Sequence, residues 1–202
     1  MGTNLPLTRR RAEARHRLLE VAEELFEQHG YERVSPADIA AVAEIGRTTF
    51  YEYFVDKEDL LASLVEERLP DVGRRLLSGI PENLPAEDQL AELAIGMVEF
   101  AITDHTLGLM IHQGLPTLST ATQHRIAEAH REISREFARL YQEAMLAGQL
   151  RPIPPDLAGV FVQDVIMAAA KVLIRHPEPK ERLHEVADET VRFLFHGLSP
   201  VK

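Results

Sequence analysis

The segment between residues 30 and 61 constrains the fold most, because it carries the start signals of two short helices separated by a tight turn. Ser35 is a favoured N-cap, Pro36 fits the first helical position, and Asp38 can complete a capping box. The helix that begins there is too short to be stable unless it packs on neighbours. Because a second helix can begin after Gly46, the segment predicts a helix-turn-helix.

The residues of the second helix divide into an inward and an outward set. Phe50 and Phe54 recur four residues apart, so they share one face and can pack inward. The outward set combines hydroxyl groups with a guanidinium, which can bond phosphate oxygens or base edges, and a helix N-terminus favours phosphate. These candidate DNA contacts are Arg47, Thr48, Thr49, Tyr51 and Tyr53.

The same residues carry a resemblance to a known family. The matching positions are Ile39-Ala40, Ala43, Ile45, Thr49-Phe50-Tyr51, Tyr53-Phe54, Lys57 and Leu60. At these positions the segment resembles the DNA-binding domain of the TetR family of bacterial transcriptional regulators. The resemblance implies that Thr49, Tyr51 and Tyr53 bind phosphates or adjacent bases. It also implies that Arg47 and Thr48 read bases, that Lys57 clamps the DNA backbone, and that Ser35 can add a phosphate contact.

The sequence departs from the family pattern in the turn and on the outward face. Glu44 replaces the usual turn glycine, so a residue with a Cβ is expected at positive φ, at a cost of about 1–2 kcal/mol. Gly46 replaces the usual serine cap, and Thr48 replaces a common glycine. Glu52 and Ala37 offer DNA no positive contact, so base reading depends on few side chains.

Two of the candidate DNA contacts have simpler explanations when each is taken alone. Tyr51 could be an ordinary half-buried ring, and its place between Thr49 and Tyr53 is what favours a DNA contact. Lys57 lies among acidic residues and could belong to a solvated helix start. The neighbouring motif is therefore what supports the assignment of both residues.

The net charge of −10 is unusual for a nucleic-acid binder, but the charge is unevenly distributed. Residues 1–17 carry five arginines against one glutamate, which leaves −14 on the remaining chain. We expect a flexible basic arm ahead of the first helix, with Arg10 and Arg11 contacting phosphates or a minor groove. A solubilising tail is the alternative. The acidic remainder should repel DNA and hold only one face of the protein to the duplex.

Helical periodicity extends along almost the whole chain, so the sequence predicts an all-α protein of about nine helices. Residues 1–56 are expected to form the arm and a three-helix DNA-binding domain, and residues 57–85 a connecting helix and linker. Residues 86–202 are expected to form a helical effector-binding and dimerisation domain. Pro70 should kink or end the connecting helix.

Five helices are predicted in the second domain. They span residues 86 to about 104, 106–113, about 119–147, 156–176 and 178–196. In family terms the last two resemble a helix pair that forms a four-helix bundle with a second subunit.

A homodimer is also predicted from the apolar character of the second-last helix. Residues 160–174 are apolar nearly all round, so one face can fill the subunit core while another meets a partner. Two-fold symmetry then predicts a near-palindromic operator. The alternative is a helix buried wholly within one subunit. The candidate interface residues are Val165, Ala169, Val172, Val186, Thr190 and Phe193.

An effector pocket is expected among flexible and aromatic side chains of the second domain, since such side chains line adaptable apolar pockets. For any one of them, ordinary core packing is the alternative. The candidates are Met97, Phe100, Met110, Phe137, Tyr141, Phe161, Asp164 and Met167. Asp164 interrupts an apolar helix and therefore needs a polar partner. His105 and His112 are seven residues apart without a tight pair of ligands, so no metal site is expected.

Composition agrees with a cytoplasmic protein that uses no cofactor. No run of apolar residues reaches the roughly 20 needed for a membrane span, and the chain has no cysteine. No nucleophile and base constellation, phosphate-binding glycine loop or metal motif indicates an enzyme. The function predicted is a homodimeric repressor that binds a double-stranded DNA operator and is released by a small, apolar effector. The alternative is a helical DNA-binding or interaction module without small-molecule regulation.

Overall fold

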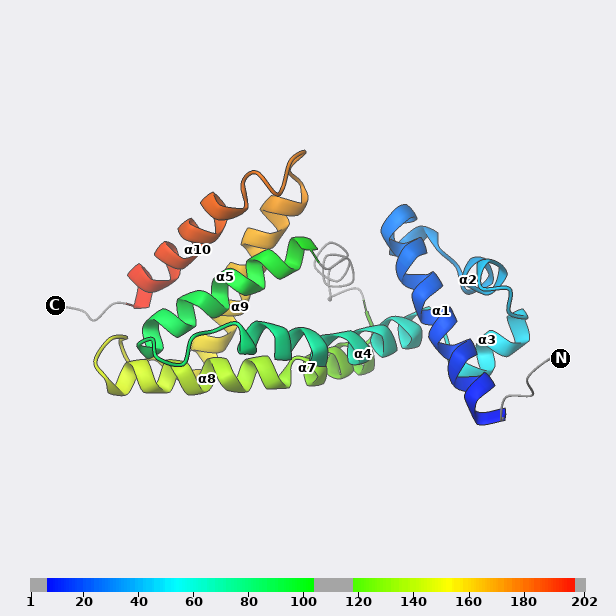
Figure 1. The fold of residues 1–202 in the computed structure, drawn as a ribbon, viewed down its shortest axis with the longest axis horizontal. Coiled ribbons are helices and arrows are strands. Elements are labelled where there is room, and N and C mark those ends of the chain that lie inside the picture. Colours follow the sequence, from blue (N-terminus) through cyan, green and yellow to red (C-terminus); the bar gives the residue numbers. More distant parts are fainter. Residues whose placement is uncertain (1–6, 104–117, 199–202) are drawn as a thin grey trace.

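The computed structural model describes residues 7–103 and 118–198, which form nine α-helices and one short 3₁₀ helix, η1 (Figure 1). The described residues contain no strand, and the predicted all-α class is confirmed. The elements are α1 (Leu7–His29), η1 (Tyr31–Arg33), α2 (Pro36–Val42), α3 (Arg47–Tyr53), α4 (Lys57–Ser78), α5 (Ala86–Thr103), α7 (Thr120–Ala129), α8 (Arg131–Leu146), α9 (Pro155–Ile174) and α10 (Leu183–Leu198).

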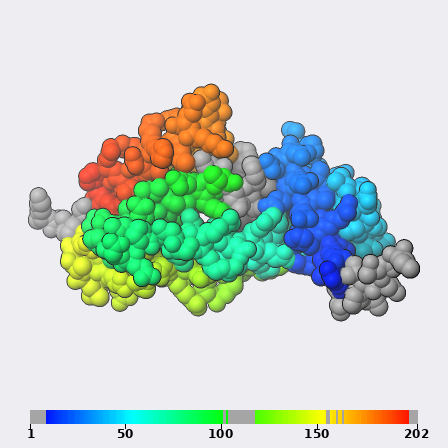
Figure 2. Space-filling view, in the orientation of Figure 1, coloured from blue at the N-terminus to red at the C-terminus, as the bar shows by residue number. Residues whose placement is uncertain are grey.

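The first three helices form a lobe at one end of the molecule, and α4 connects this lobe to the remaining helices (Figures 1 and 2). Its core is built on Leu18, Phe26, Phe50 and Leu60, all fully buried. Ile126 of α7 joins this same core with 1% exposure, although it lies more than sixty residues further along the chain. The helix-turn-helix therefore shares its hydrophobic core with α7 as well as with α4.

Helix α4 begins where the sequence predicts. Asp56 is its N-cap, and the Asp56 carboxylate accepts a hydrogen bond of 2.8 Å from the backbone N–H of Asp59. The sequence analysis expected Pro70 either to kink this helix or to end it. The helix continues through Pro70 to Ser78, so it does not end there. An unbroken α4 spans the distance between the two lobes (Figure 1).

The larger lobe is a bundle in which α5 is central. Helix α5 packs against α8, α9 and α10, and its buried side chains are shared between two core clusters. Leu90 and Leu93 face the cluster with α8, whereas Ala94 and Val98 face the cluster with α9 and α10. This arrangement places α9 and α10 side by side with one surface against α5 and the other facing outward.

The long helix expected over residues 119–147 is instead two helices, α7 and α8, and this expectation was wrong. His130 is both the C-cap of α7 and the N-cap of α8. Its ring Nδ1 lies 2.8 Å from the Ile126 carbonyl, which also accepts the His130 backbone N–H at 3.3 Å. The side chain thus adds a second hydrogen bond to a carbonyl that already accepts the backbone bond of the helix, at the position where the helix is interrupted.

The last helix also begins later than predicted. Helix α9 ends at Ile174 and α10 begins at Leu183, so residues 178–182 are not helical. Pro177 and Pro179 explain why no helix begins at Glu178, because a proline disfavours the α conformation of the residue before it. The helix expected over residues 106–113 lies outside the described residues.

Helix α9 contains a stretch, Leu157–Ile174, that by length and composition could cross a membrane, with a mean hydropathy of 1.9. It includes residues 160–174, which the sequence analysis took as apolar nearly all round while expecting no membrane span. In the structure it packs on one side against α5, α8 and α10, and 38% of the stretch is buried. Its outward apolar side chains include Phe161 and Val172, which are 54% and 53% exposed.

Candidate nucleic-acid interface and effector cavity

Helix α3 is oriented by two buried rings. Phe50 and Phe54 are 0% and 1% exposed, with ring centroids 5.7 Å apart, and Ile45 packs against the same core. Because these residues fix one face of α3 inward, Arg47 and Thr48 are exposed at its start. The N-terminal turn of α3 therefore faces away from the protein.

The three hydroxyl-bearing residues further along α3 differ in accessibility. Tyr51 is 47% exposed, and its ring meets Phe50 edge-on at 5.3 Å. Thr49 is half-buried, and Tyr53 is half-buried against the core of the small lobe. Arg47, Thr48 and Tyr51 are consequently the side chains of α3 that a duplex could reach most directly.

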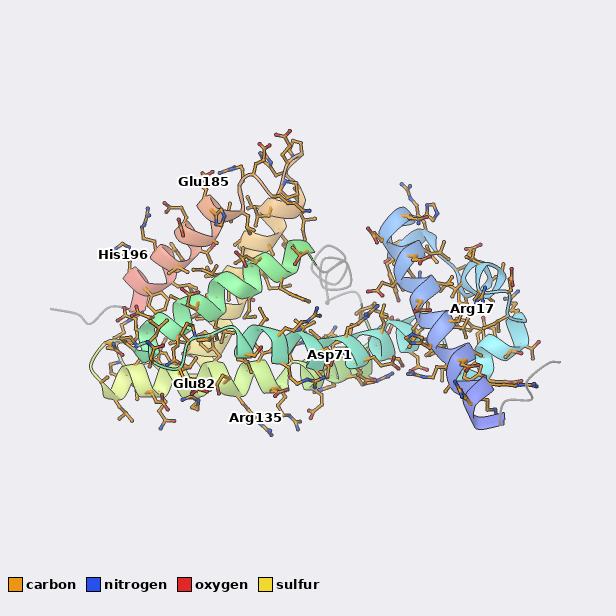
Figure 3. All side chains as sticks on the ribbon, in the orientation of Figure 1. Arg17, Asp71, Glu82, Arg135, Glu185 and His196 are labelled. Atoms are coloured by element: carbon orange, nitrogen blue, oxygen red, sulfur yellow. The ribbon has the colours of Figure 1, made fainter. Side chains whose placement is uncertain are left out.

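The turn before α3 has the strained conformation expected from the sequence. Glu44 has φ of 57°, and among the described residues it alone has a positive φ without being glycine. The Ile45 N–H donates a hydrogen bond of 2.9 Å to the Ala40 carbonyl, and this bond closes the turn. The Glu44 carboxylate lies 3.7 Å from the guanidinium of Arg17, in an exposed ion pair. Figure 3 labels Arg17 on α1.

Ser35 forms the predicted capping box at the start of α2. Its hydroxyl accepts the Asp38 N–H at 3.2 Å, and the Asp38 carboxylate accepts the Ser35 backbone N–H at 2.9 Å. Hydrogen bonds from the Ser35 side chain and backbone lower the pKa of Asp38. The Ser35 hydroxyl is therefore engaged within the protein, and its predicted phosphate contact stays a prediction.

Lys57 is held against η1. Its Nζ donates to the Tyr31 carbonyl at 2.8 Å and lies 4.1 Å from the centroid of the Tyr31 ring. Burial lowers the pKa of Lys57. A DNA phosphate that bound Lys57 would share its ammonium group with the Tyr31 carbonyl and the Tyr31 ring. Lys57 lies at the start of α4, and its predicted contact with the DNA backbone stays a prediction.

The arginines expected to form a flexible basic arm ahead of the first helix belong to that helix, and this expectation is corrected. Helix α1 begins at Leu7, so the five arginines lie on α1, with Arg10 and Arg11 on exposed positions of its first turns. Arginine, alanine and glutamate favour helix, and Arg9 pairs with Glu13 at 3.2 Å. The positive charge is therefore fixed in place beside α3.

A set of ionic contacts and hydrogen bonds joins α7 to the first half of α4, and the sequence analysis did not find it. We call this set the α4–α7 clasp; its residues are Glu58, Asp59, Ser63, Glu66, Ser119, Thr122 and Arg125. Arg125 donates to both Glu66 oxygens at 2.7 Å, to Asp59 Oδ1 at 2.5 Å and to Ser63 Oγ at 3.1 Å. These hydrogen bonds raise the pKa of Arg125, and those with Glu66 have the largest effect.

A second part of the clasp centres on Glu58. Its Oε2 accepts the Ser119 backbone N–H and the Thr122 hydroxyl, each at 3.0 Å. The clasp also reaches the end of the helix-turn-helix, because Asp59 Oδ2 accepts the backbone N–H of Val55 at 2.9 Å. Partners some sixty residues apart leave no local signal in a sequence, apart from the spacing of Asp59, Ser63 and Glu66 along one face of α4.

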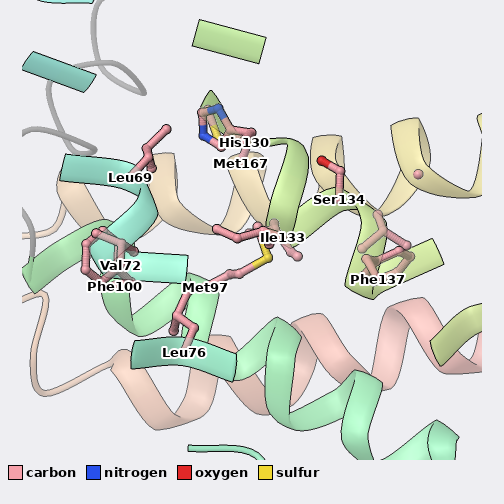
Figure 4. Close-up of a pocket in the computed structure, with 13 residues that line it drawn as sticks. Leu69, Val72, Leu76, Met97, Phe100, His130, Ile133, Ser134, Phe137 and Met167 are labelled. Carbon is pink, nitrogen blue, oxygen red and sulfur yellow. The ribbon is translucent and has the colours of Figure 1, made fainter. Parts of the chain in front are cut away.

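A cavity of about 90 Å³ lies between α4, α5, α8 and α9 (Figure 4). Four predicted pocket residues line it: Met97, Phe100, Phe137 and Met167. The other lining residues, which the sequence analysis missed, are Leu69, Val72, Leu76, His130, Ile133, Ser134, Gly159, Val162 and Ile166. The lining is apolar except for His130 and Ser134, which suits a largely apolar small molecule.

The other predicted pocket residues do not line this cavity. Tyr141 is 2% exposed in the neighbouring core, and its hydroxyl donates to the Arg151 carbonyl at 2.8 Å. Phe161 and Asp164 lie at the outer surface between α9 and α10. Met110 lies outside the described residues, as do the two histidines considered for a metal. Helix α9 directs every third or fourth residue outward, which explains the positions of Phe161 and Asp164.

The six predicted dimer residues all line one shallow groove between α9 and α10. Val165, Ala169 and Val172 come from α9, and Val186, Thr190 and Phe193 from α10. Phe193 is 70% exposed, whereas Thr190 is buried and donates its hydroxyl to the Val186 carbonyl at 2.6 Å. The groove therefore combines an exposed aromatic ring with a floor already packed within one subunit.

An all-helical protein whose second short helix presents an arginine and hydroxyl groups outward belongs to the class of helix-turn-helix DNA-binding proteins. Two family profiles match the chain. "Bacterial regulatory proteins, tetR family" matches residues 18–64, and "Tetracyclin repressor-like, C-terminal domain" matches residues 83–171. The chain belongs to the TetR family of bacterial transcriptional regulators, which is not a family of enzymes.

Relatives and solved structures agree with this assignment. The HTH-type transcriptional repressor DhaR of Mycobacterium sp. (strain GP1) is 26% identical over 192 residues, covering 94% of each chain. The transcriptional regulator FadR from Bacillus subtilis, in complex with stearoyl-CoA, has a TM-score of 0.75 at 20% identity, covering 91% of this chain and 98% of that chain. AibR in complex with isovaleryl coenzyme A and operator DNA has a TM-score of 0.70 at 20% identity, covering 90% and 98%.

Proposed function

We propose that this protein is a cytoplasmic, homodimeric repressor that binds a near-palindromic operator through α3 and is released by a small, apolar effector. The observation that carries the DNA contact is the outward face of α3. Arg47 and Thr48 are exposed and Tyr51 is 47% exposed, while Phe50 opposite them is fully buried. Among the described residues Arg47 has no ion pair, so its guanidinium is available for a base or phosphate.

The homodimer rests on the groove between α9 and α10. An exposed ring such as Phe193 costs free energy in water, and burying it against a second copy of the same surface removes that cost. A two-fold axis through this groove would present two copies of α3 to one face of a duplex, which requires operator half-sites separated by about one DNA turn or a multiple of it. Residues 1–56 would then bind DNA, residues 57–85 would connect, and residues 86–202 would bind effector and partner.

The effector rests on the cavity between α4, α5, α8 and α9. Solved structures of the same fold hold stearoyl-CoA and isovaleryl coenzyme A, which are acyl thioesters. The cavity of this protein, at about 90 Å³, is far below the roughly 300–1,000 Å³ of a site for a drug-sized ligand. A small apolar molecule is therefore the effector proposed, and a larger one would require the cavity to widen.

A second candidate is a helix-turn-helix regulator without an effector, and the small cavity volume favours it. The two candidates differ in one outcome. Effector binding must shift the equilibrium between two states, which requires different affinities for them. Operator affinity that no cavity-binding molecule changes would support the regulator without an effector.

The DNA contact is tested by selecting bound fragments from genomic DNA and measuring their affinity for variants. Arg47→Ala should weaken operator binding about 5- to 150-fold, the effect of losing a bidentate base contact of about 1–3 kcal/mol. Arg135→Ala is the matched control, because this exposed arginine lies on α8, away from α3 (Figure 3). Equal affinities of the two variants, with α-helical content unchanged, would contradict the assignment of α3.

A further inference from the structure

The cavity contains one polar group whose hydrogen-bonding state the geometry fixes. The ring Nδ1 of His130 lies 2.8 Å from the Ile126 carbonyl. A carbonyl oxygen only accepts hydrogen bonds, so Nδ1 must carry the proton in this contact. In the neutral ring the other nitrogen, Nε2, is then an acceptor without a proton.

Within the described residues no hydrogen bond to Nε2 is found, although the His130 side chain lines the cavity. Figure 4 shows the His130 ring among the lining side chains, together with Ser134. Ser134 is exposed, so water can satisfy its hydroxyl. His130 is half-buried, and its Nε2 is not sealed from solvent, so a ligand donor would replace water there. The remaining lining residues are apolar and cannot donate to Nε2.

The charge state of the ring agrees with an acceptor role. Burial lowers the pKa of His130 below its ordinary value of 6.5, against the smaller opposite effect of the Ile126 carbonyl. The imidazole is therefore neutral near pH 7. A neutral imidazole in an apolar cavity cannot balance the negative charge of a carboxylate ligand. It can accept a hydrogen bond from a hydroxyl or an amine.

We propose that His130 is the specificity-determining residue of the cavity, and that its Nε2 selects a small, uncharged, apolar molecule bearing one O–H or N–H donor. This inference rests on the proposed effector cavity and names the chemistry of its ligand. A volume of about 90 Å³ is smaller than the engineered cavity of about 150 Å³ that binds benzene, so the ligand can be no larger than a single ring and the cavity must widen to hold it. The flexible side chains of Met97 and Met167 can adjust to such a ring.

The test compares 4-fluorophenol with 4-fluorotoluene, which differ by a hydroxyl in place of a methyl group. Their affinities are measured by ¹⁹F NMR titration of the full chain and of two variants. His130→Phe keeps a ring but removes the acceptor. His124→Phe is the control, because it makes the same substitution at an exposed histidine of α7 that does not line the cavity. The ratio of phenol to toluene affinity should be about tenfold higher for the native protein than for His130→Phe, the effect of one hydrogen bond. His124→Phe should leave the ratio within about twofold of the native value.

A second measurement on the native protein does not depend on the folding of a variant. The ¹⁵N resonance of His130 Nε2 should shift when 4-fluorophenol binds and stay in place when 4-fluorotoluene binds. A native affinity ratio equal to that of His130→Phe, or an unmoved resonance, would overturn the assignment of His130 while leaving the cavity as a binding site. Failure of both probes to bind would overturn the cavity and this inference together. A loss of operator binding by Arg47→Ala is independent of all these outcomes.

Discussion

Replacing Arg125 tests how firmly α7 holds α4. Arg125→Met removes four hydrogen bonds of the α4–α7 clasp while keeping most of the side-chain length. Charge-assisted hydrogen bonds contribute about 1.5–3 kcal/mol each when protected, and exposed ion pairs about 0–1 kcal/mol. The side chains of Arg125 and Asp59 are 36% and 26% exposed, between these limits. We expect the free energy of unfolding to fall by about 2 kcal/mol, which corresponds to about 4–8 °C in Tm for a chain of this size.

The matched control is Arg139→Met. Arg139 also pairs with two carboxylates, Glu136 and Glu143, but all three lie on α8. Pairs within one helix contribute about 0.2–0.5 kcal/mol each, so this variant should lose about a quarter to a half of what Arg125→Met loses. Arg125→Lys should fall between them, because it keeps the charge and loses the bidentate geometry.

The assay is urea unfolding followed by circular dichroism at one protein concentration, since dimer formation makes stability concentration-dependent. Amide hydrogen exchange adds the location of the effect. In Arg125→Met exchange should rise at Val55, whose N–H bonds to Asp59, and stay unchanged in α10. A loss of stability no larger than that of Arg139→Met would refute the reasoning that the clasp holds α4.

Three further predictions concern the turn, the acidic part of the clasp and the groove. Glu44→Gly should raise the free energy of unfolding by about 0.5–1 kcal/mol, because glycine adopts the φ of 57° without strain; urea midpoints measure this, and an unchanged midpoint would count against it. Hydrogen bonds from Ser119 lower the pKa of Glu58 below its ordinary value of 4.5, so its stabilisation is complete above that pH and is lost as pH falls through the folded pKa. Glu58→Gln should therefore reduce the pH dependence of stability below pH 4.5, and an identical dependence in both proteins would contradict this. Phe193→Asp should weaken the dimer about 100-fold or more in sedimentation, because an unpaired charge would be buried at the interface; Leu146→Asp, equally exposed on α8, should not, and equal effects would exclude the groove.

Local signals made the small lobe predictable from the sequence. The capping box of Ser35 and Asp38, the N-cap Asp56 and the positive φ of Glu44 each depend on residues within a few positions of one another. The inward spacing of Phe50 and Phe54 likewise depends on one helical turn. Interactions between residues a few positions apart can be predicted from the sequence, and the structure contains all four of these features.

The break at His130 was not predictable from periodicity. Ile126, Ile133, Leu140 and Tyr141 keep a helical spacing across it, because His130 itself has a helical conformation with φ of −81° and ψ of −5°. The apolar pattern therefore continues in phase through a position where the helix is interrupted. The break coincides with the hydrogen bond between the imidazole and the Ile126 carbonyl, and this bond depends on a side-chain rotamer.

The same break has a consequence for how the lobes are connected. Helix α7 is held to α4 by the clasp and to the small lobe by Ile126 in its core, so α7 and the start of α4 cannot move apart without breaking ionic contacts or opening that core. At its other end α7 stops at His130, which lines the cavity. Packed side chains and ion pairs therefore form a continuous set of contacts from the cavity to Val55, the residue that follows α3 by two positions. In the proposed function, a molecule that contacts His130 would lie at one end of this set, and the end of the helix-turn-helix lies at the other.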